Sequence, residues 1–320
     1  MTGAGMPPTW VLGIDVGTTS VKALVLDAGG VVVEGASAHH GISDEADRVE
    51  VDAERWWQSL RAAVAALTVP LERVAAVGLS GNMSSVVLVD DEVRPIRPAL
   101  LLADPRGAEQ LADLSDDVTA TIVESTGNVP ETVFSISSLL WLRDHEPSAL
   151  ERSRAWLSSK DFLRARLTGE ISTEVTDAGN SLLVRADAWD DALIAAVGLP
   201  RAIFPPLLAS AGIGGTLTAA AAAATGLREG IPVAVGTGDV AAALVGSGGL
   251  PPDHLAVSLG TSATLMAGLG ERPLSSRALN KLTVHPDAEG RRFALGSLLT
   301  GGLALNWLRD SFGVAALAAA

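Results

Sequence analysis

The chain has 320 residues, 48% of them hydrophobic, which is enough for a large core and for two domains. Its 23 Lys and Arg against 37 Asp and Glu give a net charge of −14, so it lacks the basic surface that binding to nucleic acid or to an anionic membrane requires. It contains no cysteine, which excludes disulfides, thiolate nucleophiles and cysteine-based zinc or iron–sulfur sites.

The N-terminal part of the chain predicts three antiparallel strands. The apolar runs Trp10–Asp15 and Val21–Ala28 flank a Gly-Thr-Thr-Ser turn. Gly29-Gly30 is a two-residue hairpin signal, and Val31–Glu34 continues the apolar pattern after it.

A helix and two buried strands are expected next. Asp52 is a suitable N-cap, and apolar residues at helical spacing predict a helix over Ala53–Leu67. Val74–Ser80 and Ser85–Asp90 have the composition of buried strands.

The middle of the chain is predicted to be mostly helical. Its helical patterns lie between Gly or Pro stops and cover Phe134–Asp144, Ser159–Leu167, Ala188–Val197 and Thr218–Thr225. A strand over Ile231–Val235 and a helix over Asp239–Val245 follow. Lys160 and Asp161 open one of these helices, where we expect them to be structural.

Gly246–Pro252 is rich in helix and strand breakers and is the clearest linker. After it, Leu255–Leu259 and Ala263–Leu269 predict a second hairpin. The uncharged stretch Leu255–Gly270 is short for a membrane span and is interrupted by Gly and Ser, so buried strands explain it better.

The two hairpins are similar in sequence. Leu12-Gly-Ile-Asp-Val-Gly-Thr-Thr-Ser in the first resembles Ala256-Val-Ser-Leu-Gly-Thr-Ser in the second. Each is a strand followed by a Gly-Thr turn and another strand, near the start of a predicted domain. This pattern favours an ancestral duplication, with the two turns facing one cleft.

The two turns are candidate phosphate-binding loops, because small residues after a strand let backbone N–H groups converge on an anion. The candidate residues are Gly17, Thr18, Thr19 and Ser20 in the first turn and Gly260, Thr261 and Ser262 in the second. Asp15 ends the first strand and could hold Mg²⁺, mostly through water. The first turn is not a Walker A loop, since a strand follows it. An ordinary tight hairpin remains the alternative.

Asp239 follows the Gly236-Thr-Gly turn and opens a helix. One interpretation is a plain N-cap. The other is a carboxylate at a strand end, beside a cleft between domains, which accepts a proton from a sugar hydroxyl during in-line phosphoryl transfer.

The segment Gly236–Ala241 also fits the dinucleotide fingerprint Gly-x-Gly-x-x-Ala. We reject a nicotinamide-dependent oxidoreductase, because Asp239 would place a carboxylate against the pyrophosphate at the helix start. The acidic residue expected about 20 residues further on is also missing.

Taken together, these segments resemble the FGGY family of carbohydrate kinases, and its xylulokinase branch most. The matching pieces occur in family order from about Trp10 to the end. They are Gly13-Ile-Asp-Val-Gly-Thr-Thr-Ser-Val-Lys, Glu50-Val-Asp-Ala-Glu-Arg-Trp-Trp, Gly81-Asn-Met, Asp104-Pro-Arg, Leu139-Leu-Trp-Leu-Arg-Asp-His-Glu-Pro, Lys160-Asp-Phe-Leu-Arg-Ala-Arg-Leu-Thr-Gly-Glu, Thr176-Asp-Ala-Gly, Gly238-Asp and Ser258-Leu-Gly-Thr-Ser.

The resemblance implies an α/β protein of the ribonuclease H-like, actin-like ATPase fold, with two similar domains around a cleft. It implies a sugar-binding N-terminal domain over residues 10–247 and the start of an ATP-binding C-terminal domain over 254–320, truncated before the adenine-contacting segment. The cofactors would be ATP and Mg²⁺. Asp239 matches the catalytic base and Asp15 the acid near the metal. The residues that match the sugar-facing wall are Asn82, Met83, Ser84, Asp104 and Arg106.

Several positions depart from the xylulokinase pattern. Ser84 stands where His is usual, Val240 replaces an Asn after the base, and Leu102-Ala103 replaces an aromatic and an amide. Ser138 stands at the position where the first signature of the family has Lys. Because these changes remove polar or bulky groups, we expect D-xylulose to be a poor substrate.

The implied partner is a small sugar substrate, and we expect neither nucleic acid nor membrane. A homodimer stays open. The N-terminal segment lacks a basic stretch followed by an apolar one, so it is not a signal peptide, and a cytoplasmic location is expected. A noncatalytic sugar-binding or regulatory relative of the family is the alternative function.

Overall fold

A computed structural model describes residues 9–45, 48–252, 254–259, 263–272, 274, 278, 281–298 and 301–312. Its largest element is a seven-stranded sheet in the order β14-β15-β6-β1-β2-β3, with β16 also paired to β6. The strands are β1 (Trp10–Val16), β2 (Ser20–Leu26), β3 (Val32–His39), β6 (Val74–Gly81), β14 (Ile213–Thr216), β15 (Pro232–Ala234) and β16 (Thr237–Gly238). β1, β2 and β3 are antiparallel neighbours, as the sequence predicted.

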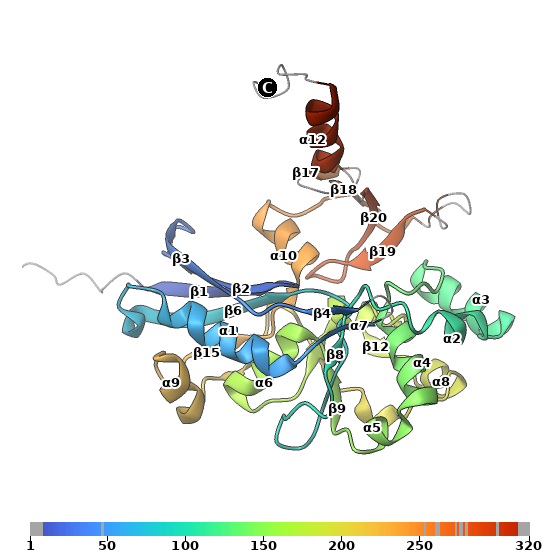
Figure 1. Cartoon of the computed structure of the whole chain (residues 1–320), viewed down its shortest axis with the longest axis horizontal. Coiled ribbons are helices and arrows are strands. Elements are labelled where there is room, and N and C mark those ends of the chain that lie inside the picture. The colour runs from blue at the N-terminus through green and yellow to red at the C-terminus, as the bar shows by residue number, and fades with distance from the viewer. Residues whose placement is uncertain are drawn as a thin grey trace, which may run out of the picture.

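Three helices cover one face of this sheet, and α10 (Asp239–Gly246) lies on the other (Figure 1). The three are α1 (Ala53–Ala65), α6 (Ser159–Thr168) and α9 (Ala219–Thr225). Asp52 caps α1 as expected, since its side chain accepts a hydrogen bond from the Glu54 N–H. Trp56 and Leu60 of α1 are fully buried in the core between the helices and the sheet.

A second hydrophobic cluster lies beside the sheet, around Trp156, Trp189 and Phe204. It is built mainly from β7 (Val87–Val89), β9 (Ala155–Leu157), α3 (Asp116–Thr126), α4 (Ser135–His145), α5 (Pro147–Glu151) and α8 (Asp191–Ala196). Short elements complete this part: β4 (Ser43–Glu45), β5 (Arg48–Val51), β8 (Ala99–Leu100), α2 (Ala108–Ala112), β10 (Thr173–Glu174), α7 (Val175–Gly179), β11 (Val184–Arg185), β12 (Ala188–Trp189), β13 (Leu207–Leu208) and the 3₁₀ turns Leu71–Arg73 and Arg201–Ile203.

The helix predicted over Ala188–Val197 is wrong at its start. Ala188–Trp189 forms β12 instead, pairing with β11. The helix begins at Asp191 because the Asp190 side chain accepts the Leu193 N–H and caps it. The strand predicted over Ser85–Asp90 is shorter, β7, and pairs with β9 outside the main sheet.

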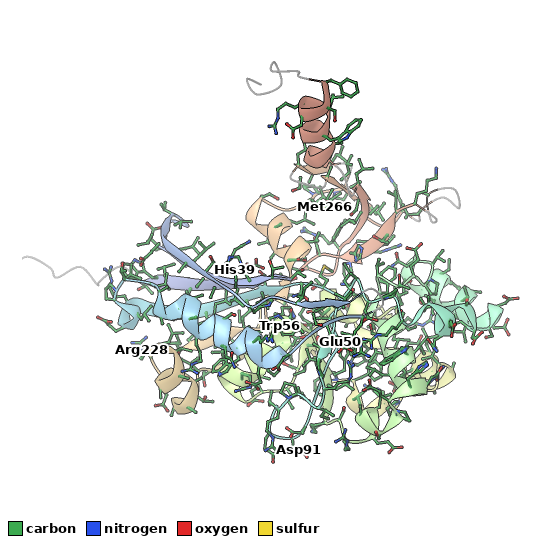
Figure 2. The ribbon with its side chains drawn as sticks, in the orientation of Figure 1. His39, Glu50, Trp56, Asp91, Arg228 and Met266 are labelled. Carbon is green, nitrogen blue, oxygen red and sulfur yellow. The ribbon has the colours of Figure 1, made fainter. Side chains whose placement is uncertain are left out.

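Beyond α10, the chain forms a four-stranded antiparallel sheet in the order β17-β18-β20-β19. Its strands are β17 (Leu255–Leu259), β18 (Ala263–Gly268), β19 (Thr283–Pro286) and β20 (Arg292–Leu298). The β17–β18 hairpin is the second one predicted. Met266 lies in this sheet, on the side of the main sheet opposite Trp56 (Figure 2).

The last described helix, α12 (Gly301–Phe312), extends away from the body of the molecule (Figure 1). None of the helices in the described ranges is long and apolar enough to cross a membrane.

Candidate active site

A cavity of about 730 Å³ lies between the main sheet and the four-stranded sheet. Residues from the first part of the chain that line it include Thr18, Asn82, Met83, Ser84, Ala103, Asn128, Asn180 and Asp239. Those from the second part include Thr264, Lys281, Thr283, His285, Leu295 and Ser297.

Two close backbone contacts bring Asp239 to the cavity wall. A Cβ on Gly236 would lie 2.3 Å from the Leu79 carbonyl oxygen, and one on Gly238 would lie 2.7 Å from Cγ of Met83. At Gly236 the neighbour is backbone and φ is +84°, so only glycine fits, whereas at Gly238 a larger residue would displace the Met83 side chain. β16 therefore lies against the end of β6, and Asp239 is the first residue of α10, with Gly238 as N-cap.

The Asp239 side chain is exposed to solvent in the cavity, although protein atoms of the cavity walls lie close around it. The resulting desolvation raises its pKa to about 6, opposed by the hydrogen bond from the Val240 N–H and reinforced by the charge of Asp15. The Val240 bond measures 2.8 Å to Oδ1. At neutral pH the group is therefore mostly ionised, yet close to the pKa that suits proton transfer.

Asp15 is the second-last residue of β1, one residue before the strand end at Val16. Its Oδ1 accepts a 2.8 Å hydrogen bond from the Ser80 hydroxyl, and its Oδ2 lies 3.7 Å from Nζ of Lys22. In the turn that follows, the Gly17 N–H donates to the Ser20 carbonyl over 2.9 Å. Thr18 lines the cavity.

The other predicted turn residues are placed differently. Gly17, Thr19 and Ser20 are not among the residues that line this cavity, although all three are described. Gly260, Thr261 and Ser262 lie outside the described residues.

The predicted segment Asn82, Met83 and Ser84 lines the cavity directly after β6. Both the backbone N–H and the side-chain Nδ2 of Asn82 donate to the Val16 carbonyl, over 2.8 and 3.0 Å. Ser84 is buried with a φ of +62°, which is uncommon for a residue other than glycine. The chain thus turns sharply at the cavity wall.

Asp104 and Arg106 do not lie on the described cavity wall, although Pro105 between them does. Arg106 donates from Nε and Nη2 to Asp104 and from Nη2 to Glu50, over 2.6–3.1 Å, and its guanidinium lies 4.2 Å from the Trp141 ring centre. Burial alone would raise the pKa of Asp104, but hydrogen bonds from Arg106 and from the Val49 N–H lower it. The Asp104–Arg106 pair therefore fixes the backbone on both sides of Pro105, which lines the cavity.

The sequence did not point to several polar residues that line the cavity, among them Asn128, Asn180, Thr283 and His285. Asn128 pairs with the backbone of Val284 in β19, donating over 2.8 Å and accepting over 2.7 Å. His285 makes hydrogen bonds of 3.0 Å to Asn180 and 2.7 Å to Thr283. Burial lowers the pKa of His285 to about 4, so the ring is neutral.

Within the described residues, no group of three or more His, Cys, Asp or Glu side chains could hold a metal ion directly. Asp15 nevertheless fits an ion held through water. Its side chain is 34% exposed, and it makes one hydrogen bond to a hydroxyl and a long ion pair with Lys22. Mg²⁺ typically keeps several waters and takes one or two carboxylates.

Comparison with known proteins identifies the family of the chain. Residues 10–246 match the family model described as the N-terminal domain of the FGGY family of carbohydrate kinases. The chain is 31% identical to the xylulose kinase of Lactococcus lactis and 34% identical to that of Streptomyces coelicolor, over 95% of its length in each case. It is also 33% identical to the glycerol kinase of Alkalilimnicola ehrlichii.

Among solved structures, the xylulose kinase of Rhodospirillum rubrum matches with a TM-score of 0.87 at 26% identity, over 96% of this chain and 64% of that one. The chain belongs to the FGGY family of carbohydrate kinases and has the actin-like ATPase fold of that family. It spans 62–63% of the length of the two xylulose kinases compared above.

Proposed function

We propose that the protein containing this chain transfers the γ-phosphoryl group of ATP to a hydroxyl of a small carbohydrate. The observation that carries the proposal is Asp239. It is a carboxylate with a raised pKa, at a strand end, on the wall of a cavity that also contains Thr18 and Asn82. Carboxylates with a raised pKa at a cavity wall are characteristic of catalytic sites, which supports this role for Asp239.

In the proposed reaction, the substrate hydroxyl oxygen forms a bond to the γ-phosphorus while the bond from that phosphorus to the β-bridging oxygen breaks, which releases ADP. The hydroxyl proton passes to the Asp239 carboxylate, which is mostly ionised at neutral pH. Asn82, Met83 and Ser84 would orient the sugar, because they line the same cavity.

Asp15 would hold Mg²⁺ through water, and the ion would offset the negative charge of the phosphates. The backbone of Gly17–Ser20, with the Thr18 hydroxyl, would bind phosphate oxygens, and Gly260–Ser262 would form the matching loop. We assign residues 10–247 to the sugar-binding domain and 254–320 to the start of the ATP-binding domain. A cytoplasmic location and a homodimer stay predictions.

For the substrate, we propose a pentulose or a related sugar or polyol. The similar proteins include xylulose kinases and a glycerol kinase at comparable identity, so overall identity does not select among these substrates. Ala103, Val240 and Met83 line the cavity and give its wall an apolar part. D-Xylulose is therefore expected to be a poor substrate.

The test is ADP release by the intact protein with ketoses, aldoses, polyols and sugar acids, with and without Mg²⁺. We expect Mg²⁺-dependent turnover with at least one of them, and weak turnover of D-xylulose. Sugar binding without ADP release from any compound would instead identify a noncatalytic relative.

A further inference from the structure

A buried polar network lies beneath the strand end that carries Asp239, and phosphoryl transfer as described above does not use it. Its members come from α6, from the β10 strand and from α7, and each side chain is at most 2% exposed: Lys160, Asp161, Arg164, Glu174, Thr176 and Asp177. Charged residues at such depth are rare unless they are paired.

Thr176 connects this network to the start of α10. Its hydroxyl donates to Oε1 of Glu174 over 2.5 Å and accepts the Gly238 N–H over 2.8 Å. It also lies 3.2 Å from the Thr237 hydroxyl. A hydroxyl has one donor and two acceptor sites, so all of its hydrogen-bonding capacity is used here.

Glu174 fixes the direction in which Thr176 donates. The Glu174 carboxylate also accepts hydrogen bonds from the Thr176 N–H, the Asp177 N–H and the Ser210 hydroxyl, over 2.9, 3.0 and 2.6 Å. Nζ of Lys160 lies 3.3 Å from its Oε1. These contacts fix the position of the Glu174 carboxylate. Because the Thr176 hydroxyl donates to it, the acceptor sites of the Thr176 oxygen face Thr237 and Gly238 of β16.

Gly238 depends on this contact. It is the N-cap of α10, but it has no side chain, and α10 has no side-chain capping hydrogen bond. Its buried N–H is bound by Thr176 and its neighbour is Asp239. A small displacement of Gly238 would therefore displace the carboxylate.

We propose that Thr176 is a positioning residue for Asp239: its hydroxyl, oriented by Glu174, fixes Gly238 and with it the place of the Asp239 carboxylate on the cavity wall. The inference rests on the proposed role of Asp239 as proton acceptor. A misplacement of about 1 Å can lower a rate by about 10²-fold.

The test compares Thr176→Val, which keeps the shape and removes the hydroxyl, with Thr176→Ser, which keeps the hydroxyl. With the best sugar found for the intact protein, we expect Thr176→Val to lower kcat by about 10- to 10²-fold while the sugar KM changes little. Thr176→Ser should retain most of the parent kcat.

Thr225→Val is the matched control. Its hydroxyl is also buried, donates to the Ala221 carbonyl over 2.8 Å and accepts the Leu227 N–H over 3.3 Å, but it lies in α9, outside the described cavity lining. It should leave kcat unchanged. If Thr176→Val has the parent kcat, or lowers kcat no more than Thr225→Val, the inference is wrong.

Hydrogen exchange of residues 237–246 provides a readout that does not need activity. Thr176→Val should accelerate exchange there, and Thr225→Val should not. Equal exchange in Thr176→Val and the parent would overturn the inference even if no sugar is phosphorylated. A parent without activity on any sugar would count against the proposed function alone.

Discussion

The parts of the chain before and after the segment Gly246–Pro252 bury their sheets to different extents. In β1 of the first part, Leu12, Ile14 and Val16 are at most 2% exposed. In β17 of the second part, Leu255, Leu259 and Val257 are 62%, 76% and 53% exposed. The same kind of apolar strand is therefore core in one part and surface in the other.

Among the described residues, the two walls of the cavity therefore differ in how much hydrophobic core lies behind them. The wall that carries Asp239 belongs to a part with two large hydrophobic clusters of its own. In the described second part, only Met266 and Phe293 belong to a buried cluster, and they share it with Leu244 of α10 and with Leu250 of the connecting segment. We therefore expect the cavity wall formed by the second part to be positioned largely by its contacts with the first part. One such contact is the pair of hydrogen bonds between Asn128 and the backbone of Val284.

The largest stability effect is expected inside the first part, at Lys160. The ammonium group lies 2.9, 3.3 and 2.7 Å from carboxylate oxygens of Asp161, Glu174 and Asp177. Lys160→Met leaves three buried carboxylates without the ammonium group that neutralises them. The free energy of unfolding, measured by urea denaturation, should therefore fall by about 3–5 kcal/mol. Lys22→Met, at an exposed pair, is the control and should change it little. Similar values for both variants would show that the network is not a stabilising element.

A matched pair of valines measures the difference between the sheets directly. Val77 in β6 is 1% exposed, and Val257 in β17 is 53% exposed. In the 320-residue chain, Val77→Ala should lower the free energy of unfolding by about 2 kcal/mol, and Val257→Ala by less than about 0.5 kcal/mol. Equal losses would mean that β17 is as well packed as β6, and the proposed difference in packing between the two sheets would be wrong.

The contact between the two parts should give a local effect. Asn128→Leu leaves the buried Val284 N–H and carbonyl without their partner, which costs about 1–3 kcal/mol for opening of this contact. Exchange of the Val284 amide should become about tenfold faster or more, since 1.4 kcal/mol corresponds to a factor of 10. Asn128→Asp keeps the acceptor for that N–H and should exchange more slowly than Asn128→Leu. Unchanged exchange in Asn128→Leu would mean that other contacts hold β19.

A further prediction concerns pH. Because burial raises the pKa of Asp239 to about 6, its proton-accepting form is present above that pH and is lost as pH falls through it. The kcat of the intact protein should therefore decrease about tenfold per pH unit below this value if Asp239 is the base. A kcat that stays level down to pH 4.5 would show that Asp239 does not accept the proton in the rate-limiting step.

Local patterns in the sequence predicted the elements that depend on local interactions. Asp52 and the apolar spacing after it predicted α1, and the two Gly-Thr turns predicted the β1–β2 and β17–β18 hairpins. Ala188–Trp189 was predicted wrongly as helix, because its pairing with β11 and the cap at Asp190 outweigh the helical pattern.

Sequence motifs located Thr18, Asn82–Ser84 and Asp239, which line the cavity, and their roles there stay predictions. Asp104 and Arg106 lie outside the described lining and pair with each other, which sequence spacing does not reveal. The pairs Asn128–Val284 and Asn180–His285 join residues 156 and 105 positions apart, so their partners come only from the tertiary fold.

The central claim, that Asp239 is the proton acceptor, is tested most directly by kcat of Asp239→Asn in the intact protein on its best sugar. Asn keeps the size and can accept the hydrogen bond from the Val240 N–H, but it cannot take the proton. The account predicts that kcat falls by about 10²–10⁴-fold while sugar affinity and melting temperature change little. A kcat near that of the parent would show that Asp239 is only the first residue of a helix.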